Sequence, residues 1–521
     1  MTVDPTVTAA STNREMFGLN VWAGVNPDLA IQTDYRLNLQ YMNPGFIRVH
    51  AADMLEANSS RSWVSGQAWD ELSVRRSIGG IRSVLPDTPI MINIPGAPSW
   101  MDLNNDGQVD ANRVDDFAAF AADLVRIVNT ENNYGVGWIE VFNEDEDDYA
   151  GNFSGMAAAH NAAAAAIKAQ DPTIKVAAGA WTQPFAAGID TLVSQLDTNA
   201  VDAFTYHQYA TGDSNIPLDQ LFDRTEGIAS GSRFARGRVD SGGRPDLPLF
   251  LGETNMFWSF DLDTRGLQQG AASAVFDALL FKELIENGDA DAVMAWNERD
   301  GAYGKTSNND ELRPAAHLYR LANEHLVGDV LASTSSDADG VESLVVETGE
   351  GLWSILLINR SENAQTVDLD LGLGDTTFTD AQLWEIDEQG LAHDADADPE
   401  GRTFSMQPLS LQLLQLAFET QAELLAGDYN NSGSVEQGDL NLVLNSWGLD
   451  ASEVPAAWAS DPPTGLIDQD ELNRVLNNWG ASSSPIVATQ SVPEPTALGF
   501  ALLLGVLTRS RALRAQRRVL D

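Results

Sequence analysis

Two glutamates each stand at the end of a run of bulky apolar residues, where a carboxylate could do chemistry. Residues 137–144 (GWIEVFNE) end in Asn143 and Glu144, and residues 247–255 (LPLFLGETN) carry Glu253 near their end. One Asn-Glu pair after an apolar run is also what a strand entering a solvated acidic loop would show. The second carboxylate favours catalysis, because two carboxyl groups in different charge states can divide acid and nucleophile roles between them.

Other polar and aromatic residues stand at the ends of further apolar runs. They are Arg48 and His50 in GFIRVH, His207 and Tyr209 in VDAFTYHQY, and Trp296 and Asn297 in DAVMAWNE. No one of these residues is informative alone, since a buried His or Trp often has only a structural role in the core. Their common position at strand ends is what makes them candidate site residues.

The elements that must position these residues alternate between apolar runs and helical patterns from Met16 to Leu326. The runs are residues 16–23, 45–50, 89–95, 137–144, 174–180, 201–209, 247–255 and 291–298. Eight such strand–helix units predict a closed (β/α)₈ barrel over residues 12–326. An open doubly wound sheet is the alternative, but it usually has a Gly-rich loop after its first strand, which FGLNVWAGVNPD lacks.

The carboxyl ends of barrel strands converge on one rim, so the candidate residues should meet there. Paired carboxylates are the groups that hydrolyse glycosidic bonds: one protonates the leaving oxygen while the other, ionised, attacks the anomeric carbon. This chemistry needs no metal or redox cofactor, and an indole offers a flat face to a sugar ring. The acids at 145–148 predict a negative field that keeps Glu144 protonated.

After Leu326 the helical periodicity gives way to short strand-like runs such as VESLVVET and GLWSILLINRS. This pattern predicts a C-terminal antiparallel β-sandwich over residues 327–418. The residues before Met16 could add an edge strand to it.

A tandem repeat follows in residues 424–482. GDLNLVLNSWG at 438–448 recurs as DELNRVLNNWG at 470–480, with 7 of 11 positions identical. Oxygen ligands at positions 1, 3, 5, 9 and 12 of a loop with Gly at position 6 are typical of a calcium loop. In the first copy they are Asp428, Asn430, Ser432, Glu436 and Asp439. The second copy has Ser460, Pro462 and Thr464 in its first three ligand positions, so one Ca²⁺ ion is expected. The unit resembles a dockerin-like module, which implies docking to a cohesin-like partner or a calcium-held stalk.

The chain carries 30 Lys and Arg against 76 Asp and Glu, a net charge of −46. Such a field repels phosphates, so nucleic acid is not an expected partner. The absence of cysteine excludes disulfides and thiolate metal sites.

The last residues, 483–521, combine a Ser- and Pro-rich linker, Pro493-Glu494-Pro495, a short apolar stretch and an arginine-rich end. The apolar stretch is too short for a membrane-spanning helix. The order of these features resembles a PEP-CTERM sorting signal, which implies bacterial export, processing by an exosortase, and a secreted or cell-surface location. The first residues lack the pattern of a secretory signal, which predicts that one precedes this start.

The motifs FNE, GETN and HQY, with Arg48 and Trp296, are similar to those of clan A retaining glycoside hydrolases, most like families 39, 51 and 30. The resemblance covers about residues 12–418 and implies that Glu144 is the general acid/base and Glu253 the nucleophile, 5 to 5.5 Å apart. It also implies that Asn143 binds the sugar 2-hydroxyl, that Tyr209 and Arg48 hold Glu253, and that His50 and His207 lie in or beside a subsite.

The same resemblance makes Trp296 the sugar platform. Trp100, Phe257 and Trp258 are further candidate stacking residues because of their place in two loops, and Asn297 is a candidate substrate-binding residue because it ends the eighth run. The expected substrate is a polysaccharide or oligosaccharide of unspecified sugar. The alternative is a carbohydrate-binding surface protein whose barrel no longer catalyses hydrolysis, although a protein that only binds sugar has no need of both carboxylates.

Overall fold

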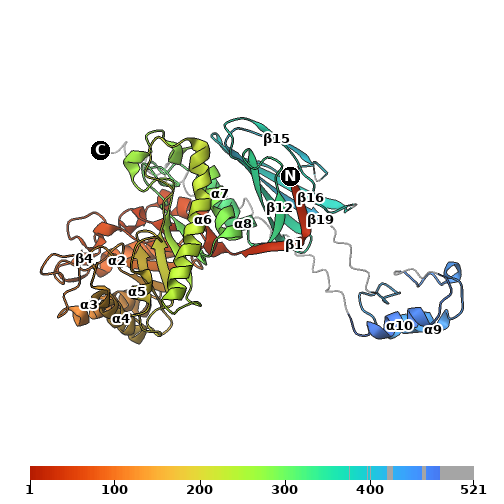
Figure 1. Cartoon of the computed structure of the whole chain (residues 1–521), viewed down its shortest axis with the longest axis horizontal. Helices are drawn as coiled ribbons and strands as arrows, with labels where there is room; N and C mark the ends of the chain where they lie inside the picture. The colour runs from red at the N-terminus through yellow and green to blue at the C-terminus, as the bar shows by residue number, and fades with distance from the viewer. Residues whose placement is uncertain (375, 396, 399, 419–425, 460–464, 482–521) are drawn as a thin grey trace, which may run out of the picture. The chain divides into compact units, whose positions relative to one another are not determined.

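The computed structural model describes residues 1–374, 376–395, 397–398, 400–418, 426–459 and 465–481. The chain forms two compact units, Met1–Glu419 and Thr420–Asp521. The first contains a closed parallel barrel and an antiparallel sheet (Figure 1), which confirms the predicted barrel with a C-terminal β-sandwich. Residues 483–521, with the predicted sorting signal, lie outside the described part. No helix within that part is long and apolar enough to cross a membrane.

Eight parallel strands close the barrel, and each overlaps one of the predicted apolar runs. They are β2 (Gly18–Val21), β3 (Ile47–Val49), β6 (Ile90–Ile94), β7 (Trp138–Val141), β8 (Lys175–Trp181), β9 (Ala203–His207), β10 (Leu249–Thr254) and β11 (Ala292–Ala295), with β11 pairing to β2. Side chains cover both faces of a parallel barrel strand, which is why these segments read as continuous apolar runs.

Helices surround the barrel, and most of them bury one apolar face. They are α1 (Thr33–Met42), α2 (Glu71–Arg82), α3 (Val114–Val125), α4 (Phe153–Gln170), α5 (Ile189–Val193), α6 (Leu218–Ser241), α7 (Ala271–Asn287) and α8 (Pro314–His325). In α3 the buried residues Phe117, Phe120, Ala121 and Leu124 recur at helical spacing. A small hairpin of β4 (Val64–Ser65) and β5 (Ala68–Trp69) precedes α2.

The antiparallel sheet has seven strands, and β1 (Thr2–Thr12) forms one edge by pairing with β12 (Gly328–Thr334). The predicted edge strand before Met16 is therefore confirmed. Beyond β12 come β13 (Val341–Gly349), β14 (Leu352–Asn359), β19 (Ser410–Phe418), β16 (Phe378–Asp387) and β17 (Gly390–Asp394).

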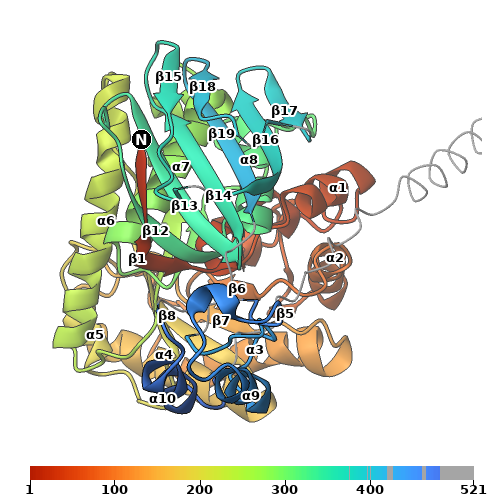
Figure 2. The same cartoon turned by 90° about the vertical axis from the view of Figure 1, so that its right-hand side faces the viewer.

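A separate ribbon of β15 (Gln365–Asp368) and β18 (Thr403–Met406) completes this region (Figure 2). One face of the large sheet packs against the ribbon, where Ile355 and Leu414 share a core with Val367. Its opposite face, including Leu356 and Leu413, belongs to the core of the barrel. The sheet is therefore anchored to the barrel by alternate residues of the same strands.

The second unit contains α9 (Gln437–Asn445) and α10 (Gln469–Asn477), one in each copy of the repeat. Both helices begin with a capping box, formed by Glu436 with Asp439 in one copy and by Asp468 with Glu471 in the other. The sequence repeat is thus a structural repeat as well.

Candidate active site

The chain leaves β7 in a strained turn that carries Asn143 and Glu144. Phe142 and Glu144 have φ angles of 75° and 59°, which non-glycine residues adopt at a cost of about 1–3 kcal/mol each. Neighbouring strand ends hold the turn, because Phe142 N donates to Ile94 O and Glu144 N to Ala180 O, each at 2.9 Å. Strain of this kind is typical of functional sites.

Arg48 of β3 lies fully buried at the centre of the site and donates to four side chains. Its Nε lies 2.6 Å from Glu140, its Nη1 lies 3.0 Å from Asn20 and 2.8 Å from Glu253, and its Nη2 lies 2.6 Å from Asn143. Burial acts to lower the pKa of Arg48, but the two carboxylates outweigh it and leave the pKa raised. The guanidinium is therefore a permanent charge at the base of the site.

Glu253, at the end of β10, receives a hydrogen bond on each carboxylate oxygen. Arg48 Nη1 donates to Oε1 and Tyr209 Oη donates to Oε2, both at 2.8 Å. Burial and the charge of Glu253 raise the pKa of Tyr209 well above its usual value, so the phenol stays protonated as a donor. These contacts stabilise the ionised form of a carboxylate.

Glu144 is more open than Glu253, with a side chain 37% exposed against 8%. His207 Nδ1, at the end of β9, lies 2.7 Å from Glu144 Oε1. Burial raises the pKa of Glu144, but the hydrogen bond and charge of His207, together with Arg48, outweigh burial and leave the pKa lowered. The prediction that neighbouring acids keep Glu144 protonated was therefore wrong.

The acidic cluster after Glu144 serves the architecture of the loops. Glu146 accepts hydrogen bonds from the backbone N of Thr182, at 2.8 Å, and from its hydroxyl. Burial, followed by Asp148 and other neighbouring acids, raises the pKa of Asp145 well above its usual value. Glu146 is thus hydrogen-bonded to the loop after β8, and Asp145 favours its neutral form. Both effects weaken the negative field that the sequence suggested around Glu144.

His50 lies beside Glu253, and Trp296 lies beside His50. His50 Nδ1 lies 2.8 Å from Asn93 Oδ1, and its Nε2 lies 4.0 Å from Glu253. Burial and Arg48 hold the pKa of His50 well below its usual value, so the ring is neutral. The half-buried indole of Trp296 has its centre 5.8 Å from that of His50.

The structure does not bring three of the predicted substrate-binding residues to the carboxylates. Asn297 is buried and bonds with Asp300 at 2.8 Å. Trp100 packs edge-on to Phe120, with ring centres 5.8 Å apart, and lines two other cavities. Phe257 is fully buried. The positions of side chains beyond the strand ends depend on how the loops pack, and the periodicity of the strands does not predict this packing.

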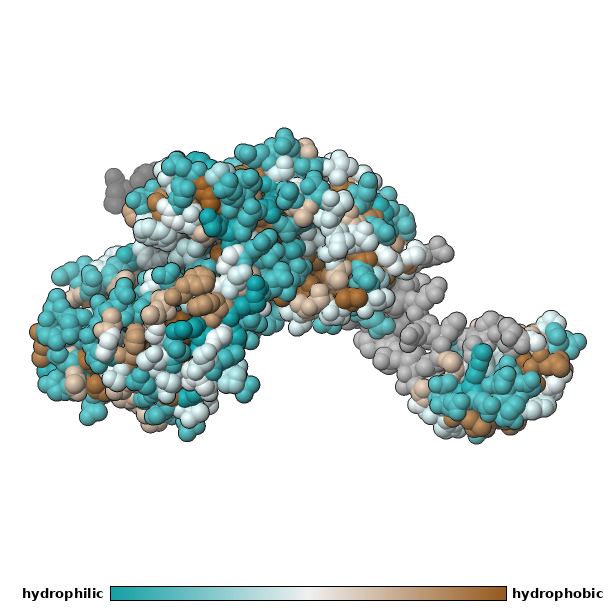
Figure 3. Space-filling view, in the orientation of Figure 1, coloured by the Kyte–Doolittle hydropathy of each residue, from teal (hydrophilic) through white to brown (hydrophobic). Residues whose placement is uncertain are grey.

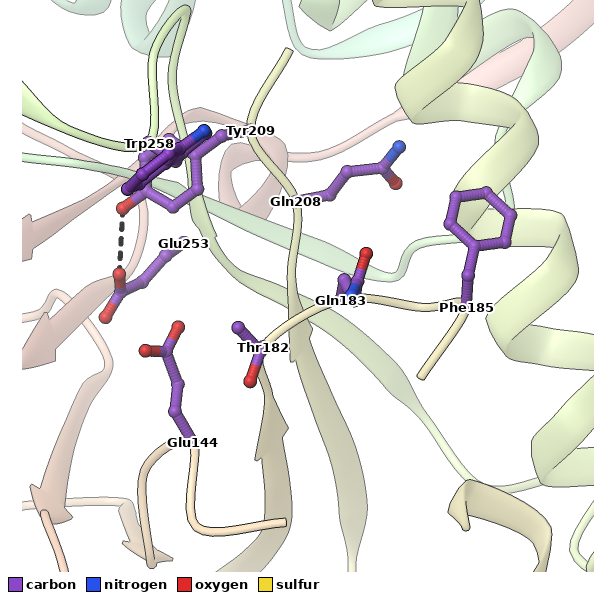
Figure 4. Close-up of a pocket in the computed structure, with 8 residues that line it drawn as sticks. All are labelled: Glu144, Thr182, Gln183, Phe185, Gln208, Tyr209, Glu253 and Trp258. Atoms are coloured by element: carbon purple, nitrogen blue, oxygen red, sulfur yellow. Dashed lines mark hydrogen bonds between the residues drawn. The ribbon is translucent and has the colours of Figure 1, made fainter. Parts of the chain in front are cut away.

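A cavity of about 490 Å³ opens beside the carboxylates (Figure 4). It is lined by Glu144, Thr182, Gln183, Phe185, Gln208, Tyr209, Glu253 and Trp258. Trp258 had been predicted as a stacking residue, whereas Thr182, Gln183, Phe185 and Gln208 had not. The sequence signal that could have identified these lining residues is the polar and aromatic residues that directly follow residues 174–180 and 201–207.

Three buried polar residues inside barrel strands were also missed. Asn20, Asn93 and Glu140 stand in the otherwise apolar segments GLNV, IMINI and WIEV. Asn20 Nδ2 joins two strand ends by donating to Gly252 O and Met294 O. The sequence signal for these residues was a polar side chain within an apolar strand, because burying a polar group without a hydrogen-bond partner is costly.

One oxygen each of Glu144 and Glu253 and a ring nitrogen of His207 lie within 4.8 Å of one another. This is the one such His and acid group that the described residues contain, and it is a possible metal ligand set. Its atoms already bond with one another or with Arg48 and Tyr209. The groups that offset the charge of the carboxylates here are the guanidinium of Arg48 and the imidazole of His207.

The predicted calcium loop folds around Asp428 in the second unit. Asp428 Oδ1 accepts from Ser432 N at 2.9 Å, and Asn430 Oδ1 accepts from the same N at 2.8 Å. Asp439 is fully buried and accepts from Asn430 N at 3.0 Å. Glu436 and Asp439 also cap the start of α9, because the side chain of each accepts from the backbone N of the other. The side chains of Asp428, Asn430 and Asp439 therefore accept hydrogen bonds from backbone N–H groups of one loop.

No protein-family model and no curated protein matches this sequence. Solved structures do match in fold. A β-xylosidase from Caulobacter crescentus has a TM-score of 0.59 and 14% identity, covering 80% of this chain and 99% of its own. A glucosidase from Croceicoccus marinus has a TM-score of 0.60 at 12% identity, with 80% and 98% covered. A family 51 α-L-arabinofuranosidase from Bifidobacterium longum has 0.57 at 14%, also with 80% and 98% covered.

Structures from glycoside hydrolase families 39 and 30 are among the matches as well, so the three families of the sequence resemblance are all represented. At these identities the likeness shows the fold of the barrel and its attached sheet.

Proposed function

We propose that this chain is a retaining glycoside hydrolase that cleaves a polysaccharide or oligosaccharide by double displacement. The observation that carries the proposal is the pair Glu144 and Glu253, whose oxygens approach within 4.8 Å at the edge of one cavity. Retaining enzymes hold their carboxyl groups about 5–5.5 Å apart, whereas inverting enzymes need about 6.5–9.5 Å to admit a water molecule. The short separation supports retention.

In the first step Glu253 attacks the anomeric carbon while Glu144 passes the proton that it shares with His207 to the glycosidic oxygen. The bond from carbon to the leaving oxygen breaks, and an ester between the sugar and Glu253 forms. In the second step Glu144 takes a proton from water, whose oxygen attacks the anomeric carbon and releases Glu253. Two inversions give net retention.

The surroundings of the two carboxylates suit these roles. Arg48 and Tyr209 each donate a hydrogen bond to Glu253, the proposed nucleophile, at 2.8 Å. His207 keeps a proton 2.7 Å from Glu144, ready for the leaving oxygen. Arg48 also holds Asn143 Oδ1, which orients the amide Nδ2 toward a sugar hydroxyl. Trp296 offers an aromatic face to the ring being cleaved.

The test measures sugar release by the full chain from a panel of polysaccharides, oligosaccharides and aryl glycosides. The panel includes xylosides, glucosides and arabinofuranosides, because these sugars occur in the names of the matched structures. Glu253→Ala should lose hydrolysis and regain turnover with azide, giving a glycosyl azide of inverted configuration. Asp147→Asn, an exposed acid of the same cluster, is the matched control.

Direct inversion of the product by the parent protein would contradict retention. Binding of sugar without release on any substrate, equal in the parent, Glu253→Ala and Glu144→Ala, would favour the carbohydrate-binding alternative.

We also propose that the loop at 428–439 holds one Ca²⁺ ion. The buried carboxylates of Asp428 and Asp439 support this, because a cation would offset the cost of burying them together. Asn430 and Ser432 would supply further oxygens. The ion would stabilise the fold of the second unit rather than take part in hydrolysis.

Export and attachment to a bacterial surface remain a proposal based on residues 483–521, with an exosortase and a cohesin-like protein as the partners implied. Fractionation of cells that express the full chain checks it. Recovery in the envelope or medium, with loss of the C-terminal peptide in mass spectra, is the expected result. Intact protein in the cytosolic fraction would contradict it.

A further inference from the structure

Exposed aromatic residues are concentrated near the cavity of the carboxylates. Among described residues 1–418, four Phe or Trp side chains are exposed, namely Phe185, Phe234, Trp258 and Phe260. The molecular surface is otherwise mostly hydrophilic on the face that Figure 3 shows. Phe185 and Trp258 line the cavity with Glu144 and Glu253. Large exposed apolar groups at a cavity mark binding surfaces.

Phe185 is held in place by a second aromatic ring. It lies in the loop after β8, and its ring centre is 5.0 Å from that of Phe234 on α6. The two side chains are 55% and 44% exposed, so the pair keeps an open aromatic face. Glu146 fixes the start of the same loop through Thr182.

Trp258 is fixed relative to Glu253 by backbone pairing that continues past the barrel. Gln208 N donates to Glu253 O at 2.9 Å, and Thr211 N donates to Met256 O at 3.0 Å. Gly212 lies against the indole, since a Cβ there would come within 2.3 Å of Trp258 Nε1. The indole is nevertheless 65% exposed, so its position is defined while its surface stays free.

Amide side chains lie between the carboxylates and Phe185. Figure 4 shows Gln183 and Gln208 in this position, beyond Thr182. Glu144 and Glu253 are the only charged residues among the eight that line the cavity. Amides bind hydroxyl groups, aromatic faces bind the C–H faces of sugar rings, and a lining with negative charge alone disfavours uronates and sulfates.

The cavity reaches from both carboxylates to Phe185 and Trp258. Glu144, Glu253 and Tyr209 line it, whereas Asn143 and Trp296, which are proposed to contact the ring being cleaved, do not. The leaving oxygen must meet Glu144, so the leaving group extends into this cavity.

Resting on the proposed function, we infer that Phe185 and Trp258 form a leaving-group subsite for an uncharged sugar chain. The substrate class is therefore an uncharged oligosaccharide or polysaccharide that continues for at least one sugar beyond the cleaved bond. Gln183 binds hydroxyls of that part of the chain, whereas the amide of Gln208 donates to Gly227 O of α6.

The test compares two substrates with the same sugar on the cleaved side. One is an oligosaccharide, and the other is a glycosyl fluoride, whose leaving fluoride does not reach the aromatic residues. Phe185→Ala and Trp258→Ala should each lower the ratio of kcat/KM for the oligosaccharide to kcat/KM for the fluoride by roughly tenfold. Phe185→Trp should restore most of the ratio. Phe260→Ala, an exposed aromatic that does not line the cavity, should leave the ratio unchanged.

The outcomes separate this inference from the proposed function. Equal loss on both substrates, or an unchanged ratio in both alanine variants, would overturn the leaving-group subsite while hydrolysis by the parent still stands. Higher kcat/KM for a chain carrying uronate on the leaving side than for its uncharged counterpart would overturn the stated substrate class. Failure of the parent to hydrolyse either substrate would remove the proposed function and this inference with it.

Discussion

His207 lies between the two carboxylates, with its Nδ1 2.7 Å from Glu144 Oε1 and 3.9 Å from Glu253 Oε2. Burial lowers the pKa of His207, but Glu253 and Glu144 outweigh burial and leave it raised. The pKa of Glu144 is lowered in return. The two side chains therefore titrate as a pair that shares one proton, held on the imidazole before a substrate binds.

Replacement of His207 by Asn should shift the basic limb of the pH profile of kcat/KM to lower pH. In the parent, the pair keeps its proton until the pH exceeds the raised pKa of His207. In the variant, Glu144 alone must hold the proton, and a carboxyl group releases it at lower pH. The profile for a substrate with a poor leaving group measures the shift. His393→Asn, which replaces a histidine of β17, is the control. An unchanged basic limb would show that His207 does not share the catalytic proton.

Replacement of Glu140 by Gln should lower the free energy of unfolding by about 3 kcal/mol. Glu140 and Arg48 are both fully buried and 2.6 Å apart, so the change leaves a buried guanidinium short of one counter-charge. Urea unfolding measures the effect. Asp116→Asn breaks an exposed pair with Arg113 and should cost less than about 1 kcal/mol. Similar losses in the two variants would contradict the central role of Arg48.

The positions of the barrel strands could be predicted because burial on both faces leaves a strong signal in the sequence. Residues 89–95 are apolar almost throughout, and β6 occupies Ile90–Ile94. Strands at the edges of the sheet were harder to predict, since β17 (Gly390–Asp394) is short and mostly exposed. The two glutamates could be placed because strand ends of a barrel share one rim.

The charge state of Glu144 could not be predicted, because it depends on which groups the fold brings near. The acids that follow Glu144 in the sequence suggested a negative field that would raise its pKa. His207, 63 positions away, instead makes the hydrogen bond that lowers the pKa of Glu144. Phe185 and Gln183 were missed for a related reason. They follow a strand that contributes no carboxylate, and only the closed barrel shows that its loop borders the site.

Stability should fall between pH 4.5 and 7 through the ionisation of Glu298. Burial raises the pKa of this carboxyl group to about 7, against the hydrogen bonds of Trp22 N, Gly24 N and Tyr35 Oη. Because the folded pKa lies above the unfolded value of 4.5, the contribution is fully present below pH 4.5 and is lost as the pH rises through 7. Such a shift corresponds to roughly 3 kcal/mol.

Urea unfolding at intervals from pH 4 to 8 measures this dependence. Glu298→Gln should be less stable at low pH, because an amide group must face one of the N–H donors, and its stability should change less over the same interval. Glu56→Gln, at an exposed acid in the loop after β3, is the control. Parallel curves for the parent and Glu298→Gln would show that Glu298 does not titrate in this range.

Removal of Ca²⁺ should lower the unfolding temperature of the second unit without changing that of the barrel. Asp428 and Asp439 are buried in one loop, and a Ca²⁺ ion bound by their oxygens would hold that loop together. At a free Ca²⁺ concentration 100 times the Kd, binding adds about 2.7 kcal/mol of stability. Calorimetry of the full chain with Ca²⁺ and with EDTA resolves the two transitions. Asp428→Asn should abolish the difference, whereas Asp450→Asn, which caps a short helix outside the loop, should retain it. A transition that EDTA does not move would contradict calcium binding in this loop, and because hydrolysis would be unaffected, the proposed catalytic role of the barrel would still stand.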